Sequence, residues 1–387
     1  MRLISRCLAL AGLIVLFTAA AVRAQDFDTP ASMAHMVDIG SGSVLFSRAA
    51  DRRIPPASLA KLMTVEFVFA EIAAGRLSGE QVFTVSENAW RTGGAPSRTS
   101  TMFAELGSSI RVEDLLRGVI VQAANDGCIV LAEGIAGSEA AFAERLNERA
   151  RAIGLADSVF VNATGLPAEG QHTTMRDMVR LAAHIIRTYP GFYPIFAERE
   201  FTWNGILQRS RNPLFAFDMG ADGLAMGFSE EGGFGIVGSV VQDGRRIVAA
   251  LSGLDTDRRR GDEARRLLDW GIKGFATNPL FDAGEVVGAA RLFGGEKATV
   301  ALRADGPVSV LIPVNNRERV TARIVYQGPV RAPVEAGTPV GALRIWVGEA
   351  VMQETPLYAA ESVGRGTLVQ RATDAVVELL TGWTRLI

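Results

Sequence analysis

Ser58 and Lys61 place a hydroxyl and an amine three residues apart, directly after the Pro-Pro-Ala segment at residues 55–57. On a helix this spacing puts both side chains on one face, about one turn apart, so that the amine can take the hydroxyl proton. Serine is a weak nucleophile until a neighbour removes its proton, and a lysine can do so only when its pKa is lowered. The pair therefore predicts a serine nucleophile with a lysine base. The same short pattern also arises by chance as a solvated helical pair, so the surrounding chain must decide.

Groups suited to other chemistries are scarce. The histidines His35, His172 and His184 do not have the spacing of zinc ligands, and we expect neither a metal nor another cofactor. Cys128 lies in an apolar stretch, so its predicted role is that of a buried structural thiol, and the other cysteine, Cys7, lies in the N-terminal segment. The 40 basic and 42 acidic residues are balanced, which argues against a nucleic-acid partner.

The N-terminus has the pattern of a secretory signal. Arg2 and Arg6 precede a largely apolar run at residues 8–22, and the small side chains of Val22 and Ala24 suit a signal peptidase. We expect cleavage after Ala24 and an exported protein. The alternative, a membrane anchor, is less favoured because the run is shorter than the ~20 residues that a spanning helix needs.

Helical and strand patterns predict an α+β domain over residues 25–276, after the signal peptide at 1–24. Two short apolar runs around a glycine turn predict one hairpin at residues 36–46, and a similar pattern predicts another at 235–251. Apolar residues that recur at three and four positions predict helices between them. These helices are expected at about 58–74, from 112 onward, at 125–135, at 138–153 and at 175–188, with a last one at 262–270. Strands at both ends predict a sheet that joins the N- and C-terminal segments.

The remaining chain divides into two further units. Short β-prone runs separated by Gly, Pro and Asn predict a small all-β domain over residues 277–365. In residues 366–387 apolar side chains fall on one helical face. They are Leu368, Ala372, Ala375, Val376, Leu379, Leu380 and Trp383. Such an amphipathic helix either docks on its own protein or lies in a membrane interface, and the exposed C-terminal position favours the membrane.

Six stretches of this chain carry a family resemblance. They lie at residues 54–64, 115–122, 125–133, 160–166, 200–206 and 222–224. Together they resemble the low-molecular-weight penicillin-binding proteins that act as D-alanyl-D-alanine carboxypeptidases. The resemblance implies an exported, periplasmic serine peptidase that trims the peptide stems of peptidoglycan and that β-lactams acylate. It also implies a β-lactamase-like domain, a helical cluster on an antiparallel sheet, followed by a β-rich domain and a C-terminal helix attached to the outer face of the inner membrane.

Three motifs of that family give expected roles to residues of this chain. In the first, Ser58 attacks the carbonyl between the two D-alanines while Lys61 handles the proton, and the backbone N–H of Ser58 belongs to the oxyanion hole. In the second, Ser-x-Asn, the asparagine is Asn125 and holds the substrate amide, while the serine relays a proton to the leaving group. In the third, Lys-Thr-Gly, a strand pairs with the substrate and its polar side chains fix the terminal carboxylate. Only its glycine, Gly227, remains here.

The second and third motifs are altered. Ala123 stands at the position of the relay serine, and Ala225 and Met226 replace the lysine and the threonine. Removing one partner of a desolvated charge contact costs about 2–5 kcal/mol. Without the neighbouring cation, the pKa of Lys61 should also be less strongly lowered. By its position relative to a matching helix, Arg260 is the residue expected to reach the substrate carboxylate instead, although it could equally be a solvated arginine at a helix start.

Three hypotheses follow. The first is a working carboxypeptidase with reduced or altered activity, because the first motif is intact. The second is a catalytically weak homologue that binds peptidoglycan or a partner at the membrane, because two motifs have lost their polar groups. The third, a β-lactamase, rests on the spacing of Glu200 and Asn204 alone, and it is least favoured because lactamases have no counterpart of the β-rich region.

Overall fold

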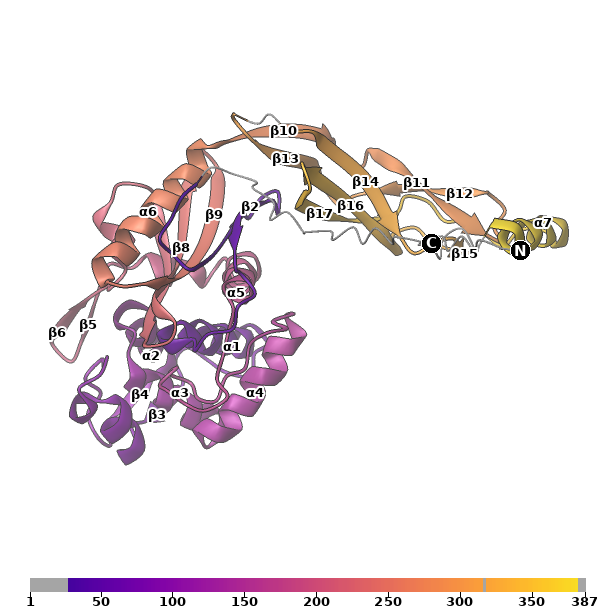
Figure 1. The fold of residues 1–387 in the computed structure, drawn as a ribbon. Helices are drawn as coiled ribbons and strands as arrows, with labels where there is room; N and C mark the ends of the chain where they lie inside the picture. The colour runs from indigo at the N-terminus through magenta and orange to yellow at the C-terminus, as the bar shows by residue number, and fades with distance from the viewer. Residues whose placement is uncertain (1–26, 316–317, 382–387) are drawn as a thin grey trace, which may run out of the picture.

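The computed structural model describes residues 27–315 and 318–381. The expected signal peptide at residues 1–24 lies outside the described residues, as does Trp383 of the expected C-terminal helix. Figure 1 shows a rounded part, built from helices and a sheet, followed by an elongated β-rich part with a helix at its far end.

A five-stranded antiparallel sheet forms the centre of the rounded part, with the strand order β2-β1-β9-β8-β7. Its strands are β1 (Met33–Asp38), β2 (Val44–Arg48), β7 (Ala221–Ser229), β8 (Gly233–Gln242) and β9 (Arg245–Leu254). Met33 of β1 lies opposite Ser252 of β9, and Asp38 lies opposite Ile247. Both predicted hairpins are present, and the predicted pairing of the N- and C-terminal segments is confirmed.

Helices cover this sheet. Five of them form a cluster, α1 (Lys61–Ala73), α2 (Val112–Gln122), α3 (Asn125–Ala136), α4 (Glu139–Ala152) and α5 (Met175–Thr188). The sixth, α6 (Asp257–Lys273), packs on β8 and β9. The largest apolar core lies inside the five-helix cluster, and a second one lies between the sheet and α6. The helices predicted from 112, 125, 138 and 175 are confirmed to within a few residues.

Two helices begin elsewhere than expected. The helix predicted from 58 becomes an α-helix only at Lys61, because Ser58 lies in a 3-10 turn, η1 (Ala57–Ala60), and Ala57 has a positive φ of 47°. A left-handed residue cannot belong to a right-handed α-helix. The helix predicted from 262 begins at Asp257, because the hydroxyl of Thr256 caps it by accepting a hydrogen bond from the backbone N–H of Arg259.

Short elements in the rounded part escaped the sequence patterns, which need several residues to show a period. The two small hairpins are β3 (Val82–Thr84) with β4 (Ser109–Arg111), and β5 (Glu200–Trp203) with β6 (Ile206–Arg209). The short helical turns are η2 (Ala89–Gly93), η3 (Ala95–Ser97), η4 (Tyr193–Ala197) and η5 (Pro213–Ala216). One of these hairpins, β5–β6, leads directly into the functional cleft.

The elongated part is built from β-strands. Its strands are β10 (Phe275–Phe281), β11 (Val286–Phe293), β12 (Thr299–Arg303), β13 (Val308–Pro313), β14 (Val320–Tyr326), β15 (Val330–Arg331), β16 (Pro339–Val347) and β17 (Ala350–Ala359). They form a sheet of order β14-β16-β17-β12-β11-β15 and a pair β10-β13. Val347 and Met352 join the apolar core beside α6, and Ser43 donates a 2.8 Å hydrogen bond to Gln353. The β-rich part is thus packed against the rounded part, and the helix α7 (Leu368–Thr381) follows it.

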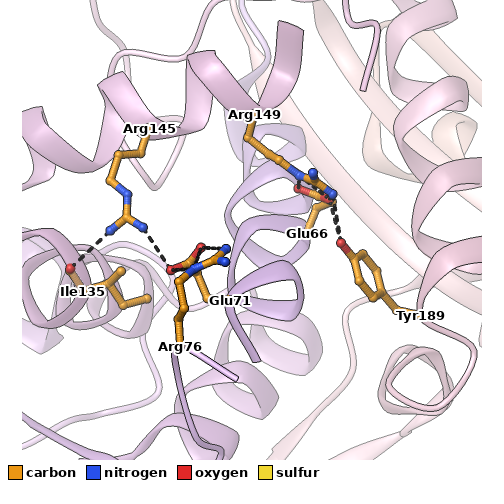
Figure 2. Close-up of polar contacts among 7 residues, drawn as sticks. All are labelled: Glu66, Glu71, Arg76, Ile135, Arg145, Arg149 and Tyr189. Carbon is orange, nitrogen blue, oxygen red and sulfur yellow. Dashed lines mark hydrogen bonds and ion pairs between the residues drawn. The ribbon is translucent and has the colours of Figure 1, made fainter. Parts of the chain in front are cut away.

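A buried charge network holds α1 in place (Figure 2). Glu66 on α1 is fully buried, and it accepts hydrogen bonds from Arg149 of α4 at 2.7 Å and from Tyr189 at 3.1 Å. His184 of α5 lies 3.1 Å from the same carboxylate. Burial alone would raise the pKa of Glu66, but the hydrogen bonds from His184 and Arg149 outweigh it and the pKa is lowered. The ionised carboxylate therefore ties α1 to both neighbouring helices.

Candidate active site

The predicted nucleophile and base are in contact. Nζ of Lys61 lies 3.0 Å from Oγ of Ser58, although the two residues belong to a 3-10 turn and an α-helix. This is the distance at which a proton passes between two heavy atoms. Ser58 lines an open cleft that encloses about 530 Å³, and Lys61 lines it too. The geometry suits attack by Ser58 on a carbonyl that lies in this cleft.

Lys61 is almost fully buried, with 4% of its surface exposed. Burial lowers the pKa of Lys61 to about 8; the nearby Cys128 opposes this shift, while the positive charge of Arg211 adds to it. The ammonium form donates a second hydrogen bond, of 2.6 Å, to the carbonyl of Thr164. Lys61 thus has two features that lower the pKa of a lysine, burial and a nearby cation. The cation is Arg211, which belongs to none of the three sequence motifs.

Asn125 begins α3 directly beside the altered second motif. Ala123 closes α2 in a left-handed conformation with φ of 56°, and its side chain lines the cleft. The amide of Asn125 donates a 2.9 Å hydrogen bond to the hydroxyl of Thr99, while its Oδ1 is buried without a partner among the described residues. Asp126 fixes the loop that carries Thr99 by accepting a hydrogen bond from Thr101 at 2.5 Å. Asn125 thus keeps an unused acceptor at the first residue of α3 but does not itself line the cleft.

The strand β7 forms the opposite wall of the cleft, and this wall is apolar. Leu224, Ala225 and Met226 line it, and none of these side chains carries a strong hydrogen-bond donor. Gly227 follows and packs against the nucleophile: a Cβ at this position would lie 3.0 Å from the backbone nitrogen of Ser58. Glycine therefore allows the two walls to pack closely at this position, and the substrate contact expected of Gly227 stays a prediction.

Arg260 lies behind β7 and does not line the cleft. Its side chain is 7% exposed and forms an ion pair with Asp257. One guanidinium nitrogen lies 2.9 Å from the sulfur of Met226, and another lies 3.4 Å from the carbonyl oxygen of Gly227. Nε of Arg260 is buried without a partner among the described residues. Met226 therefore stands between this arginine and the space where a substrate would bind.

A third segment lines the cleft and was not predicted. Ser210, Arg211 and Asn212 follow strand β6 and bring a hydroxyl, a guanidinium and an amide to the site. The nearest signal in the sequence is the polar run at residues 208–212, directly after a stretch that carries the family resemblance. By contrast, Glu200 and Asn204 lie in the β5–β6 hairpin and do not line the cleft, and Asn204 donates a hydrogen bond to Glu105 instead.

Potential metal ligands do not cluster in the described part of the chain. Within residues 27–315 and 318–381, no group of three His, Cys, Asp or Glu side chains is placed to hold a metal ion. Cys128 is buried against Lys61 and Asp126, and burial raises the pKa of its thiol to about 12. A thiol with such a pKa is not a nucleophile at neutral pH. The Ser58 hydroxyl and the Lys61 amine stay the predicted reactive pair of the cleft.

Comparisons with known proteins agree on one family. Residues 19–256 match the family model described as D-alanyl-D-alanine carboxypeptidase, and residues 275–365 match the C-terminal domain of penicillin-binding protein 5. The D-alanyl-D-alanine carboxypeptidase DacD of Salmonella typhimurium is 34% identical over 342 residues, which cover 88% of each chain.

Solved structures are similar as well. Penicillin-binding protein 5 of Haemophilus influenzae superimposes with a TM-score of 0.76 at 31% identity, covering 88% of this chain and 99% of that one. Penicillin-binding protein D2 of Listeria monocytogenes, in its ampicillin-bound form, superimposes with a TM-score of 0.56 at 25% identity, covering 64% of this chain and 100% of that one.

Proposed function

The chain belongs to the D-alanyl-D-alanine carboxypeptidase family of serine peptidases, and we propose that it removes the terminal D-alanine of peptidoglycan stem peptides through an acyl-enzyme on Ser58. Lys61 takes the proton from Ser58 as its oxygen attacks the carbonyl of the penultimate D-alanine. The backbone N–H of Ser58 donates to the oxyanion that develops. Water then hydrolyses the ester and frees the enzyme.

The observation that carries this proposal is the 3.0 Å contact between Ser58 and a lysine whose pKa is lowered to about 8. With such a pKa, about a tenth of Lys61 is neutral at pH 7, compared with less than about a thousandth for an ordinary lysine. The altered motifs therefore leave the base usable, because burial and Arg211 supply what the missing third-motif lysine does not.

Recognition of the terminal carboxylate has to differ from the family pattern. Ala225 and Met226 offer it no donor, and Arg260 is shielded by Met226. Arg211 is the guanidinium that lines the cleft, and it donates a 3.0 Å hydrogen bond to the hydroxyl of Ser100. We assign the carboxylate to Arg211, because an arginine can keep one hydrogen bond and still present two parallel N–H groups to an anion. Asn125 is kept as the residue that holds the substrate amide, as in the family motif, and because its unused Oδ1 is buried and lies outside the cleft lining, this contact requires the start of α3 to open toward the substrate.

The direct test is release of D-alanine from a pentapeptide stem by the purified protein, with Ser58→Ala as the control. A second measurement is mass spectrometry after incubation with penicillin, which should show one adduct on Ser58. Release no faster than that of Ser58→Ala, together with no adduct, would rule out the proposed activity. An adduct without release would leave a working nucleophile with another substrate.

A second candidate function is peptide binding with little turnover. It is favoured by one observation, the apolar face of β7 with Arg260 turned toward Met226 and Asp257. The triple change Ala123→Ser, Ala225→Lys and Met226→Thr separates the two functions. A large gain in D-alanine release from a nearly inactive parent would support the binding function, whereas a parent that is already fast and gains little would exclude it.

The proposal extends to location. Peptidoglycan lies outside the cytoplasm, so the enzyme has to be exported to the periplasm, in keeping with the expected signal at residues 1–24. Within the described residues, no helix is both long and apolar enough to cross a membrane. On α7, Leu368, Val369, Val376 and Leu379 are each more than half exposed. The helix contacts the β-rich part through polar groups, with Asp374 accepting a 2.7 Å hydrogen bond from Gly294.

These contacts favour attachment of α7 to the outer face of the inner membrane, with its apolar residues in the interface. Flotation with vesicles of phosphatidylethanolamine and phosphatidylglycerol tests this, using the full mature chain. Val376→Asp should reduce the bound fraction, while Val351→Asp, at a valine of β17 that is 46% exposed, should not. Equal binding of both variants and the parent would contradict membrane attachment through α7.

A further inference from the structure

Breaking the peptide bond requires a proton at the leaving nitrogen. Lys61 holds that proton after it has activated Ser58, but the leaving amine lies on the far side of the carbonyl, so a second hydroxyl is useful as a relay. Ala123 stands where the family motif places this hydroxyl, and its methyl group cannot carry a proton. If the chain is active, the proton must take another route.

Ser210 offers a second hydroxyl in the cleft for that route. Of the described side chains that line the cleft, Ser58 and Ser210 are the two that carry a hydroxyl. Ser210 follows β6, and its backbone N–H donates a 2.7 Å hydrogen bond to the carbonyl of Arg199, which fixes the backbone at this point. The segment thus brings a hydroxyl into the cleft from an element that belongs to none of the three motifs.

The segment lies beside the altered second motif. The backbone N–H of Arg211 donates a 3.4 Å hydrogen bond to the carbonyl of Val121, two residues before Ala123, and both of these residues line the cleft. Ser210 therefore enters the cleft next to the end of α2, where the relay serine is missing.

The hydrogen-bond state of Ser210 also suits a donor. Its Oγ accepts a 3.3 Å hydrogen bond from the backbone N–H of Asn212, and among the described residues its own proton has no acceptor. Lys61 makes two side-chain hydrogen bonds there, to Ser58 and to the carbonyl of Thr164, so one N–H of the ammonium group is left to donate.

We infer that Ser210 is the proton relay to the leaving group, an inference that rests on the proposed carboxypeptidase function. In the tetrahedral intermediate, Oγ of Ser210 gives its proton to the leaving nitrogen as the C–N bond breaks and the bonding electron pair passes to nitrogen. Oγ of Ser210 takes a proton from Nζ of Lys61 in the same step. The products are the ester on Ser58, neutral D-alanine amine and neutral Lys61, so every proton is accounted for.

The test compares two leaving groups. Ser210→Ala should slow release of D-alanine from a peptide by about 100-fold, the lower end of the range for loss of a general acid. In the same variant, the rate of acylation by a thioester with the same acyl group should change by less than about threefold. The leaving group is then a thiolate, whose thiol has a pKa of about 8.5, and it leaves without a proton. A merely structural role of Ser210 would slow both substrates equally.

Two further variants and a control complete the test. Ser210→Thr keeps the hydroxyl and should retain most of the peptide activity, and Ala123→Ser added to Ser210→Ala should restore it. Ser108→Ala, at a half-buried serine whose hydroxyl donates to the carbonyl of Glu105, is the control and should leave both rates unchanged. An active parent with an equally active Ser210→Ala variant would overturn the relay alone. A parent that neither releases D-alanine nor forms the penicillin adduct would overturn the relay and the proposed function together.

Discussion

The two walls of the cleft differ in how they are built. The wall that carries Ser58 and Lys61 is polar, buried and braced from behind by the ionised carboxylate of Glu66. The wall formed by β7 presents Leu224, Ala225 and Met226 and keeps its nearest cation, Arg260, out of the cleft. Activation of a nucleophile depends on two atoms at a fixed distance, whereas recognition of a substrate can be supplied from several elements. The first wall keeps the expected pair, and we propose that residues 210–212 supply the polar groups that the second wall lacks.

The largest effect is expected at the activating wall. Lys61→Gln should slow acylation of Ser58 by penicillin by about 1,000-fold or more, because the neutral amide cannot take the proton of the serine. The rate is measured by mass spectrometry of the adduct. Lys273→Gln, at an exposed lysine of α6 that pairs with Asp269, is the matched control and should acylate at the parental rate. If Lys61→Gln is acylated at the parental rate, Lys61 is not the base that activates Ser58.

The brace behind the activating wall should matter for stability. Glu66→Gln leaves Arg149 without its buried partner and should lower the free energy of unfolding by about 3 kcal/mol, the lower end for a broken buried pair because Arg149 is partly exposed. Glu71→Gln, whose partners Arg76 and Arg145 are 60% and 38% exposed, should cost less, about 1 kcal/mol. Urea unfolding monitored by circular dichroism gives both values.

The effect of Glu66 should also depend on pH. Its pKa is lowered in the folded state, so its stabilising contribution is present above the carboxyl pKa of the unfolded chain, about 4.5. The contribution is lost as the pH falls through the lower folded-state value. The stability difference between the parent and Glu66→Gln should therefore shrink below about pH 4. A difference that stays constant down to pH 3 would show that the ionised form is not what stabilises α1.

A smaller effect is expected where the two walls meet. Gly227→Ala places a methyl group 3.0 Å from the backbone nitrogen of Ser58, so β7 or the turn that carries the serine must move by a few tenths of an ångström. Such a displacement should slow acylation by about 10-fold, because larger shifts of about 1 Å cost about 100-fold. Gly191→Ala, where a Cβ meets nothing within 4 Å, is the control.

The smallest effect is expected at Arg211, the cation that we propose in place of the missing third-motif lysine. Lys61 must be neutral to act, so the acylation rate should rise with pH to a plateau with a midpoint near 8. Arg211→Gln removes a charge that lowers this pKa and should move the midpoint upward by less than about one pH unit. Arg209→Gln, at an exposed residue of β6, should leave it in place. An unchanged midpoint in Arg211→Gln would mean that burial alone activates Lys61.

Much of the scaffold was predictable from the sequence because its signals are local. The helices α2 to α5 and the hairpins β1–β2 and β8–β9 follow from residues that recur at fixed spacing, and the pair Ser58 and Lys61 follows from three residues of separation. The short strands β3 to β6 were not predictable, because three or four residues show no period. The strand β7 was expected only through the family resemblance, because its Gly-rich start at Gly223 and mixed burial hide the alternation of a strand.

The sequence by itself predicted Ser58 as the nucleophile and Lys61 as its base, and it showed the losses at Ala123, Ala225 and Met226 and the order of the longer helices and hairpins around them. Only the tertiary structure decided which other groups lie near those changed positions. It turned Arg260 away from the cleft, set Gly227 against Ser58, and brought Ser210 and Arg211 beside α2 from about 90 residues further along the chain. The physical reason is that a helical spacing fixes a local contact whatever surrounds it, while hydrogen bonds and charge contacts between distant segments exist only after the chain has packed.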